Sequence, residues 1–300
     1  GTVAIPDSRL DDLARILNSR KVTHAEIVFL DTHSFDLTHS READGLMIVI
    51  GVFSEGDPKK DAGKIFTDLI LSDLEIIENR LPRMKKEIES GKKTNDLPEY
   101  NLLLRCKARL DKGRPLRELG LSGEEHKMLS GYQFLSLKPA FLTANLGEAQ
   151  MGASPAAEVF EFARNENLKA VELCAKIEEE ILELPEAERM EFLKGMGINE
   201  LSEDKIVKMA FETMDLISFF TVKGEETRAW PVKNGARAIE AAGKVHSDIQ
   251  RGFIKAEVIN YKDFMECMDF NEARRRGLLK LEGKDYVVQD GDILNFKFNV

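Results

Sequence analysis

Two short polar runs stand where two expected strands end. The apolar run from Pro139 to Ala144 is expected to be a strand and leads into Asn145-Leu146-Gly147-Glu148, and a second strand near Ala170 to Leu173 leads into Cys174-Ala175-Lys176. Open α/β sheets bind ligands at the carboxyl ends of their strands, so these runs predict a ligand site. Asn-Leu-Gly is also an ordinary exit from a strand into a loop, and the pattern alone leaves both interpretations open.

Other constellations of chemically active residues are not found in the chain. Its five histidines show no metal-ligand spacing, and neither a Ser-His-Asp set nor a catalytic carboxylate pair can be assembled, so no catalytic residue is assigned. The three cysteines, Cys106, Cys174 and Cys267, are odd in number and scattered, which argues against a disulfide framework and favours a reducing cytoplasm. The phosphate-cradling pattern G-x-x-x-x-G-K-S/T occurs nowhere in the 300 residues.

Composition and patterning indicate the elements that must position these residues. At 300 residues and 43% hydrophobic, the chain can hold two or three domains with real cores, and strands alternating with helices favour an α/β class. The longest apolar run, Leu46 to Phe53, is too short to cross a bilayer and is interpreted as a strand buried on both faces, and the run Ala25 to Leu30 is interpreted as another strand. Pro6-Asp7-Ser8 is expected to cap a helix whose apolar face includes Leu10 and Leu13.

A helical arm is predicted in the middle of the chain. Between Ile70 and Ile88 apolar residues recur four and three apart, which is typical of a seam for a partner helix, and the segment from Leu103 to Leu110 supplies that partner. A polar loop from Gly91 to Pro98 separates the two, so we expect an antiparallel, coiled-coil-like pair, kinked where Pro82 removes a backbone donor.

The C-terminal part shows the pattern of a small α+β unit. Apolar and polar residues alternate strictly from Leu294 to Val300, as in a strand with one buried face. Turn signals at Gln289 to Asp292 and at Lys223 to Glu225 predict two hairpins. Short helices expected at Ala236 to Val245 and Asn271 to Arg276 complete a β-grasp arrangement. A module this small usually binds rather than catalyses.

Long sequence runs in this part resemble one protein family. The runs are RAW at Arg228, then AAGKVHSDIQRGFIKAEV, then LEGKDYVVQDGDILNFKFNV, which ends at Val300. In this order they resemble YchF, an Obg-like branch of the P-loop GTPases. The resemblance implies an incomplete P-loop GTPase-like α/β nucleotide-binding domain at 1–66 and 132–216, with the runs Ala25 to Leu30 and Leu46 to Phe53 in one sheet. It also implies an inserted antiparallel helical arm at 67–131 and a TGS-like β-grasp domain at 217–300, expected to fold as its own unit.

The resemblance also implies roles for the two polar runs. GTPases carry N/T-K-x-D at the first run, where the aspartate accepts both N–H donors of guanine, whereas YchF-like proteins carry N-x-x-E, as Asn145 and Glu148 do here. Cys174-Ala175-Lys176 resembles the S-A-K loop that touches the base through backbone amides. The resemblance therefore implies a base site of Asn145, Leu146, Glu148, Cys174, Ala175 and Lys176, with ATP preferred over GTP.

A metal role is implied for Asp31. In the family the corresponding strand runs into D-x-x-G, whose aspartate holds Mg²⁺ through water, and this chain has Asp31-Thr32-His33-Ser34-Phe35. Ser34 stands in place of the glycine, and Phe35 stands where many GTPases place a water-orienting glutamine, so slow hydrolysis is expected. Asp31 is equally interpretable as a turn residue that ends a strand.

Two functions remain open at this stage. The first is an ATP-preferring, Mg²⁺-dependent P-loop NTPase, cytoplasmic and acting near the ribosome. The second is a ribosome or RNA adaptor with a degenerate nucleotide site. The charge of −10 opposes indiscriminate nucleic-acid binding, so an RNA contact is expected to be local, at Arg274, Arg275 and Arg276. Because the phosphate loop and its strand are absent, the natural polypeptide is expected to begin upstream. Oligomeric state is not predicted.

Overall fold

The computed structural model describes residues 1–32, 37–53, 56–91, 96–150, 156–185, 188–189, 195 and 202–299. The chain separates into two compact units. Leu30–Lys205 forms what we term the central unit, and Gly1–Phe29 together with Ile206–Val300 forms the C-terminal unit. Among the described helices, none has the length and continuous apolar character that a bilayer crossing requires.

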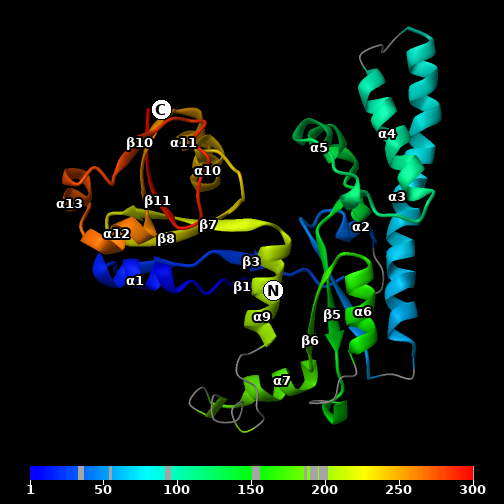
Figure 1. Ribbon diagram of the computed structural model, residues 1–300, viewed down its shortest axis with the longest axis horizontal. Helices are drawn as coiled ribbons and strands as arrows, with labels where there is room; N and C mark the ends of the chain where they lie inside the picture. The colour runs from blue at the N-terminus through cyan, green and yellow to red at the C-terminus, as the bar shows by residue number, and fades with distance from the viewer. Residues whose placement is uncertain are drawn as a thin grey trace. The chain divides into compact units, whose positions relative to one another are not determined.

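A three-stranded parallel sheet lies at the heart of the central unit (Figure 1). Its strands are β4 (Leu46–Gly51), β5 (Ala140–Asn145) and β6 (Lys169–Leu173), in that spatial order. The middle strand, β5, has a neighbour on each side, and its first five residues are buried, four of them apolar. The parallel arrangement brings the carboxyl ends of all three strands to one edge.

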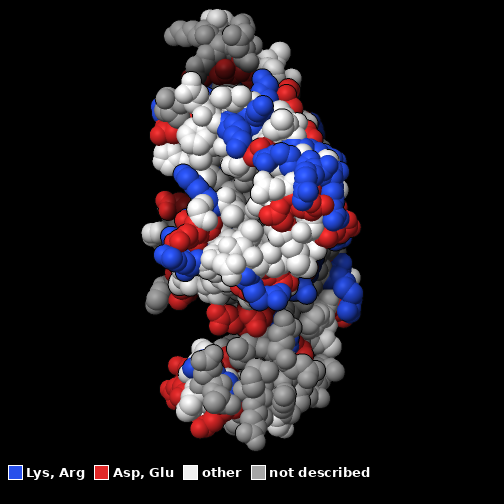
Figure 2. Space-filling view, turned by 90° about the vertical axis from the view of Figure 1, so that its left-hand side faces the viewer, with Lys and Arg blue, Asp and Glu red and all other residues white. Residues whose placement is uncertain are grey.

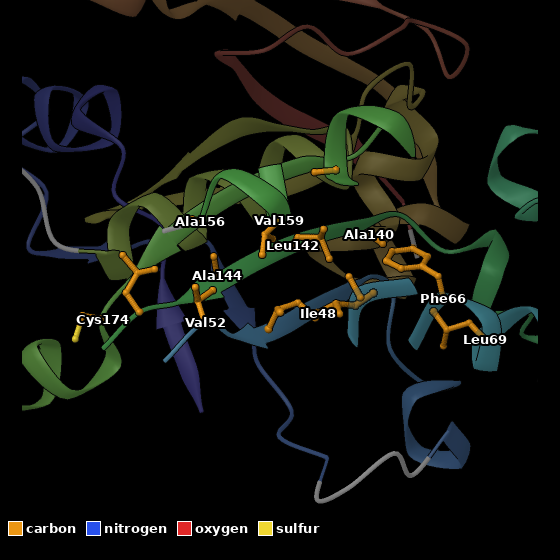
Figure 3. Close-up of a cluster of buried hydrophobic side chains, with 14 of the residues drawn as sticks. Ile48, Val52, Phe66, Leu69, Ala140, Leu142, Ala144, Ala156, Val159 and Cys174 are labelled. Atoms are coloured by element: carbon orange, nitrogen blue, oxygen red, sulfur yellow. The ribbon is translucent and has the colours of Figure 1, made fainter. Parts of the chain in front are cut away.

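Two helices cover one face of this sheet. They are α3 (Pro58–Glu89) and α6 (Ala157–Asn165). Phe66 and Leu69 of α3 and Val159 of α6 pack against Ile48 and Leu142 of the strands, as Figure 3 shows. The opposite face of β4 was predicted to be buried as well, and this prediction was wrong, because alternate residues of this edge strand, Met47 and Val49, are exposed.

Helix α3 continues beyond the sheet into the predicted arm. Asp57 caps its first turn, and the second half of its 32 residues packs against α4 (Leu97–Leu110) (Figure 1). Ile77 and Met84 of α3 and Leu103 of α4 are fully buried in a separate apolar cluster, so the arm has its own core. The helix pair agrees with the predicted seam, while its coiled-coil character and the kink at Pro82 stay predictions.

A buried ion pair holds the base of the arm. Asp73 of α3 has no exposed surface, and its carboxylate accepts backbone N–H groups from Leu135 at 2.9 Å and Ser136 at 2.7 Å. Arg41 donates to the same carboxylate at 3.0 Å.

The remaining short elements of this unit are α2 (Leu37–Ser40), η2 (Leu116–Glu118), α5 (Gly123–Leu129), η3 (Ser130–Tyr132), η4 (Leu135–Leu137), η5 (Glu148–Gln150) and α7 (Ala175–Glu183).

A six-stranded mixed sheet organises the C-terminal unit, in the order β10-β9-β11-β7-β8-β2 (Figure 1). The strands are β2 (Lys21–Thr23), β7 (Leu216–Lys223), β8 (Glu226–Lys233), β9 (Phe253–Asn260), β10 (Lys280–Glu282) and β11 (Asp292–Phe298). β7 and β8 form the predicted hairpin, in which Gly224 takes a positive φ of 61° that favours glycine. β11 lies parallel to β7, as in a β-grasp fold.

Helices cover both faces of this sheet. On one face α10 (Ala238–Val245) and α11 (Ser247–Arg251) lie over Phe219, Leu294 and Phe296. On the other face Leu10 and Leu13 belong to a core that also holds side chains from the remaining helices. Those helices are α1 (Ser8–Ile16), α9 (Ser202–Thr213), α12 (Tyr261–Cys267) and α13 (Phe270–Arg275).

The N-terminal segment differs from the prediction. The strand predicted at Ala25 to Leu30 was placed in the sheet that contains β4, but the structure has β3 (Glu26–Val28) paired antiparallel with β1 (Thr2–Ala4). In addition, β2 pairs in parallel with β8. Residues 1–29 therefore group with the C-terminal unit rather than with the sheet of the predicted domain 1–66. The physical reason is that the apolar face of α1 is buried against the C-terminal sheet.

The second predicted hairpin is also absent. β10 and β11 do not pair with each other, because β9 lies between them and pairs antiparallel with both. Gly291 takes a φ of 85°, and Asp292 accepts the backbone N–H of Gln289 at 2.9 Å, so the local turn signal was read correctly. The turn delivers the chain into β11 from the loop that precedes it and does not join two adjacent strands.

Candidate functional site

The three parallel strands of the central unit end side by side. Val52, just after β4, donates its backbone N–H to the carbonyl of Asn145 at 2.8 Å. Leu146, just after β5, donates to the carbonyl of Leu173 at 2.7 Å. These two hydrogen bonds continue the backbone pairing beyond the ends of the strands. They bring both predicted polar runs to the same edge of the sheet.

The side chain of Asn145 joins the two runs. Its Oδ1 accepts the backbone N–H of Ala175 at 3.0 Å, and Ala175 is the first residue of α7. The first N–H groups of a helix have no partner within the helix, so this contact satisfies one of them. Asn145 thus fixes the start of α7 against the end of β5.

Glu148 and Lys176 form an ion pair across the same edge. Both side chains are substantially exposed, with 46% and 68% of their surfaces accessible. The hydrogen bond to Glu148, and the attraction of its charge, raise the pKa of the Lys176 ammonium. The edge therefore presents a carboxylate paired with a cation, and the remaining lone pairs of that carboxylate can still accept hydrogen bonds from a ligand.

The side chains of Leu146 and Cys174 lie beneath the surface of the candidate site. They are 4% and 2% exposed, and Figure 3 shows Cys174 at the same end of the core as Val52 and Ala144. Their side chains complete the apolar core, so only their backbone groups are available to a ligand. The Cys174 side chain is thus a small buried hydrophobic group.

Gln150 and Phe53 belong to this edge but were missed by sequence reasoning. The Gln150 side chain accepts the N–H of Gly147 at 2.8 Å and donates to the carbonyl of Val52 at 3.2 Å, which fixes the loop after β5. Phe53 is 59% exposed, and a Cβ at Gly147 would lie 3.1 Å from its Cβ, so this site favours glycine. The Asn-Leu-Gly pattern could have signalled the glycine, but nothing local in the sequence indicates the approach of Phe53.

Asp31 is exposed at the beginning of the central unit. Ser34 and Phe35, which carried the predictions on γ-phosphate sensing and slow hydrolysis, lie outside the described residues. Within the described part of the chain, no group of three or more His, Cys, Asp or Glu side chains could hold a metal ion. A single carboxylate suits Mg²⁺ only when phosphates and water supply the other ligands.

The predicted arginine patch is locally compensated. Arg274 donates to Glu257 at 3.2 Å, while Arg275 and Arg276 both pair with Glu272. All three guanidinium groups remain about half exposed or more. Figure 2 faces this side of the C-terminal unit and shows Lys and Arg side chains gathered there with Asp and Glu between them.

A cavity of about 530 Å³ lies elsewhere in the central unit. Phe160 and Arg164 of α6 and Val171 and Glu172 of β6 contribute to its lining. None of the residues predicted for the base site lines it, so it is not the predicted site. The strand-end edge is an open surface whose groups are held by the hydrogen bonds described above.

Comparisons with known proteins identify the family to which this chain belongs. The model of the family YchF-GTPase_C, described as "Protein of unknown function (DUF933)", matches residues 216–299. The chain is similar along its whole length to two proteins named "Ribosome-binding ATPase YchF". The one from Bacillus subtilis is 33% identical and the one from Haemophilus ducreyi 35% identical, and the match covers 89% of each relative.

A solved structure agrees with the fold. The Schizosaccharomyces pombe YchF GTPase superposes with a TM-score of 0.85 at 24% identity, covering 99% of this chain and 86% of that one. The match therefore covers both units. With relatives more than 30% identical over the full length of this chain, the sequence match is sufficient to assign the family, and the chain belongs to the YchF family.

Proposed function

We propose that this chain provides the base-binding part of an ATP-preferring, ribosome-associated NTPase. The observation that carries the proposal is the hydrogen bond from the Ala175 N–H to Asn145 Oδ1, which joins the two loops that the family resemblance assigns to the base. Similarity to proteins named as ribosome-binding ATPases supports the activity and the partner.

The preference for ATP follows from Glu148. Guanine presents two adjacent N–H donors, and an aspartate at the corresponding position accepts both. Here Glu148 is paired with Lys176, which places a cation on the carboxylate and occupies part of its accepting capacity. Adenine needs no such acceptor pair, because its edge combines a donor with an acceptor.

The phosphates and Mg²⁺ must be held by other groups. No G-x-x-x-x-G-K-S/T run occurs in the 300 residues, and we propose Asp31 as the residue that faces Mg²⁺ when phosphates and water complete its coordination. Without a backbone nest and lysine for the phosphates, we expect the 300 residues alone to bind ATP weakly. Micromolar binding by calorimetry would contradict this expectation.

The base site is tested by Asn145→Ala. Loss of one hydrogen bond that orders the site removes about 1 kcal/mol, which corresponds to roughly fivefold weaker binding of whichever nucleotide binds. Saturation-transfer NMR at millimolar ATP and GTP measures such weak binding, and Asn165→Ala, at the exposed end of α6, is the matched control. Stronger transfer to guanine than to adenine protons, or an unchanged signal in Asn145→Ala, would exclude the proposed site.

A non-catalytic adaptor is the second candidate, and it is favoured by Ser34, which stands in place of the glycine whose amide meets the γ-phosphate in the family. An adaptor binds ribosomes equally with and without nucleotide, whereas an NTPase changes its ribosome affinity between ATP and ADP. Ribosome co-sedimentation of the chain with no nucleotide, with millimolar ATP and with millimolar ADP, concentrations that load even a weak site, separates the two. For either function we propose Arg274, Arg275 and Arg276 as contributors to the contact with ribosomal RNA.

A further inference from the structure

Strand register places two lysines directly opposite each other in the C-terminal sheet. Lys255 of β9 pairs with Lys297 of β11, and the next pair on the same side is Glu257 with Asn295. Residues two apart on a strand share a face, so these four side chains form one polar block. Like charges directly opposite on neighbouring strands destabilise a sheet, because their Cβ atoms are only about 5 Å apart.

The block lies where the covered part of the sheet face ends. Further along the same two strands, Ile259 and Ile293 form the preceding pair on this side and are buried in the apolar core. Lys255 is exposed and Lys297 is 44% exposed, so helices do not cover this end of the face. Arg274 reaches the block from α13.

Glu257 stands at the centre of the block as its single carboxylate. It accepts hydrogen bonds from Asn295 at 2.8 Å, Lys297 at 3.0 Å and Arg274 at 3.2 Å, and its own side chain is 16% exposed. Burial raises the pKa of this carboxyl group, but the hydrogen bonds from Lys297 and Asn295 outweigh burial and lower the pKa overall. Glu257 is therefore an ionised oxyanion held by three converging donors.

We term Lys255, Glu257, Arg274, Asn295 and Lys297 the open face. Its three cations face one carboxylate, an excess of two positive charges in a chain whose net charge is −10. No hydrogen bond or ion pair of Lys255 occurs among the described residues, so its charge is uncompensated. The arrangement suits an anion that bridges the two lysines and competes with Glu257 for the other donors.

We propose that the open face binds the phosphate backbone of single-stranded RNA, and that Glu257 limits its affinity by occupying a phosphate-like position between Lys297 and Arg274. This inference rests on the proposed association with the ribosome and locates one RNA contact. An acidic peptide that extends the sheet would need a free strand edge, but β9 and β11 are interior strands with neighbours on both sides. The face offers charge and no backbone donors, which fits a phosphate chain.

Two variants with opposite expected effects on RNA affinity test the proposal in the 300-residue chain. Lys255→Ala with Lys297→Ala removes two phosphate contacts, which lowers the salt slope of log K by about 1.4 and the affinity by on the order of tenfold to thirtyfold at ~0.1 M salt. Glu257→Gln releases Lys297 and Arg274 and should tighten binding several-fold. The measurement is fluorescence anisotropy of a labelled oligouridine across a salt series.

The control is Lys244→Ala with Lys284→Ala. It changes the net charge equally at exposed lysines outside the open face, one in α10 and one in the loop after β10. The proposal is overturned if both double variants weaken RNA binding equally, if Glu257→Gln leaves affinity unchanged, or if poly-glutamate binds as tightly as RNA with the same response to all variants. Circular dichroism melting confirms that each variant is folded.

Ribosome co-sedimentation separates this inference from the proposed function. If the unaltered chain does not sediment with ribosomes, the proposed association fails whatever the oligouridine result. If the unaltered chain sediments and Lys255→Ala with Lys297→Ala sediments equally well, the open face is not a contact, while the proposed function stands.

Discussion

At the scale of single residues, one carboxylate in each unit gathers several donors. Asp73 receives two backbone N–H groups and the Arg41 guanidinium in the central unit, and Glu257 receives three side-chain donors in the C-terminal unit. Neither is adjacent in sequence to its partners, which lie between 17 and 63 positions away. The contacts of each carboxylate therefore depend on the tertiary structure, and replacing the carboxylate tests whether those contacts exist.

Removing the Asp73 carboxylate is expected to be strongly destabilising. Asp73→Ala leaves the Arg41 guanidinium without a counter-charge and two backbone donors without an acceptor, and breaking a buried ion pair in this way costs about 3–5 kcal/mol. Urea unfolding followed by circular dichroism measures the loss. Glu75→Ala, two residues away at an exposed position of α3, should change the free energy of unfolding by less than about 0.5 kcal/mol. Equal effects would contradict the role given to Asp73.

Glu257 should make stability depend on pH in the acid range. Its pKa in the folded state is lowered, so its contribution is fully present above the unfolded value near 4.5 and is lost as the pH falls through the folded value. Glu257→Gln should lower the melting temperature at pH 7, and this difference should shrink at pH 3. Glu75→Gln serves as the exposed control. A difference that is the same at both pH values would refute the assignment.

At the scale of elements, the arm offers an internal comparison. Leu103 has no exposed surface, whereas its neighbour Leu104 is 41% exposed on the same helix. Leu103→Ala leaves a cavity among Ile77, Met84 and Cys106 and should cost about 2–4 kcal/mol, while Leu104→Ala should cost less than about 1 kcal/mol. Hydrogen exchange of α4 amides measures the effect locally. Similar exchange in both variants would show that the arm lacks the packed core described.

Elements were predictable where their signal was local. The β7–β8 hairpin follows from Gly224 in a two-residue loop, and α1 follows from the Asp7 cap and its apolar spacing. The partner of a strand is not a local property. The run near Ala25 pairs with β1, and β11 passes beside β9 instead of β10, because pairing is decided by the apolar faces that become buried together.

In the candidate site as well, local features could be predicted from the sequence, whereas contacts between distant segments could not. Asn145 and Lys176 follow strand ends, and a parallel sheet brings strand ends together, so their proximity could be predicted. The two hydrogen bonds of the Gln150 side chain depend on the geometry of its loop. The contacts between Glu257 and its donors depend on the register of β9 against β11. Neither leaves a pattern in the sequence that could be read without the fold.

At the scale of the whole molecule, residues 1–29 are a structural part of the C-terminal unit. Arg9 pairs with Asp290 at 2.7 Å and lies over the Phe220 ring, and Tyr261 donates to Asp12 at 3.0 Å. The stretch 217–300, predicted to fold as its own unit, leaves this face without its cover when it is produced alone.

A fragment of residues 206–300 should therefore be stabilised by a peptide of residues 1–29. At a hundredfold excess over its dissociation constant the peptide adds about 2.7 kcal/mol, and the melting temperature should rise by several degrees. A peptide carrying Leu10→Asp and Leu13→Asp is the control, because both leucines are fully buried in the shared core. Equal melting temperatures with either peptide would show that the C-terminal module is independent of the segment.

The continuous helix α3 has a mechanical consequence for the central unit. Leu69 lies in the sheet core and Glu89 near the far end of the arm, twenty residues apart, or about 30 Å along an α-helix. When a helix segment of that length moves as one body, a tilt of about 10° at the sheet displaces its tip by about 5 Å, close to one helical pitch. A rearrangement too small to alter the strands would thus be amplified at the end of the arm.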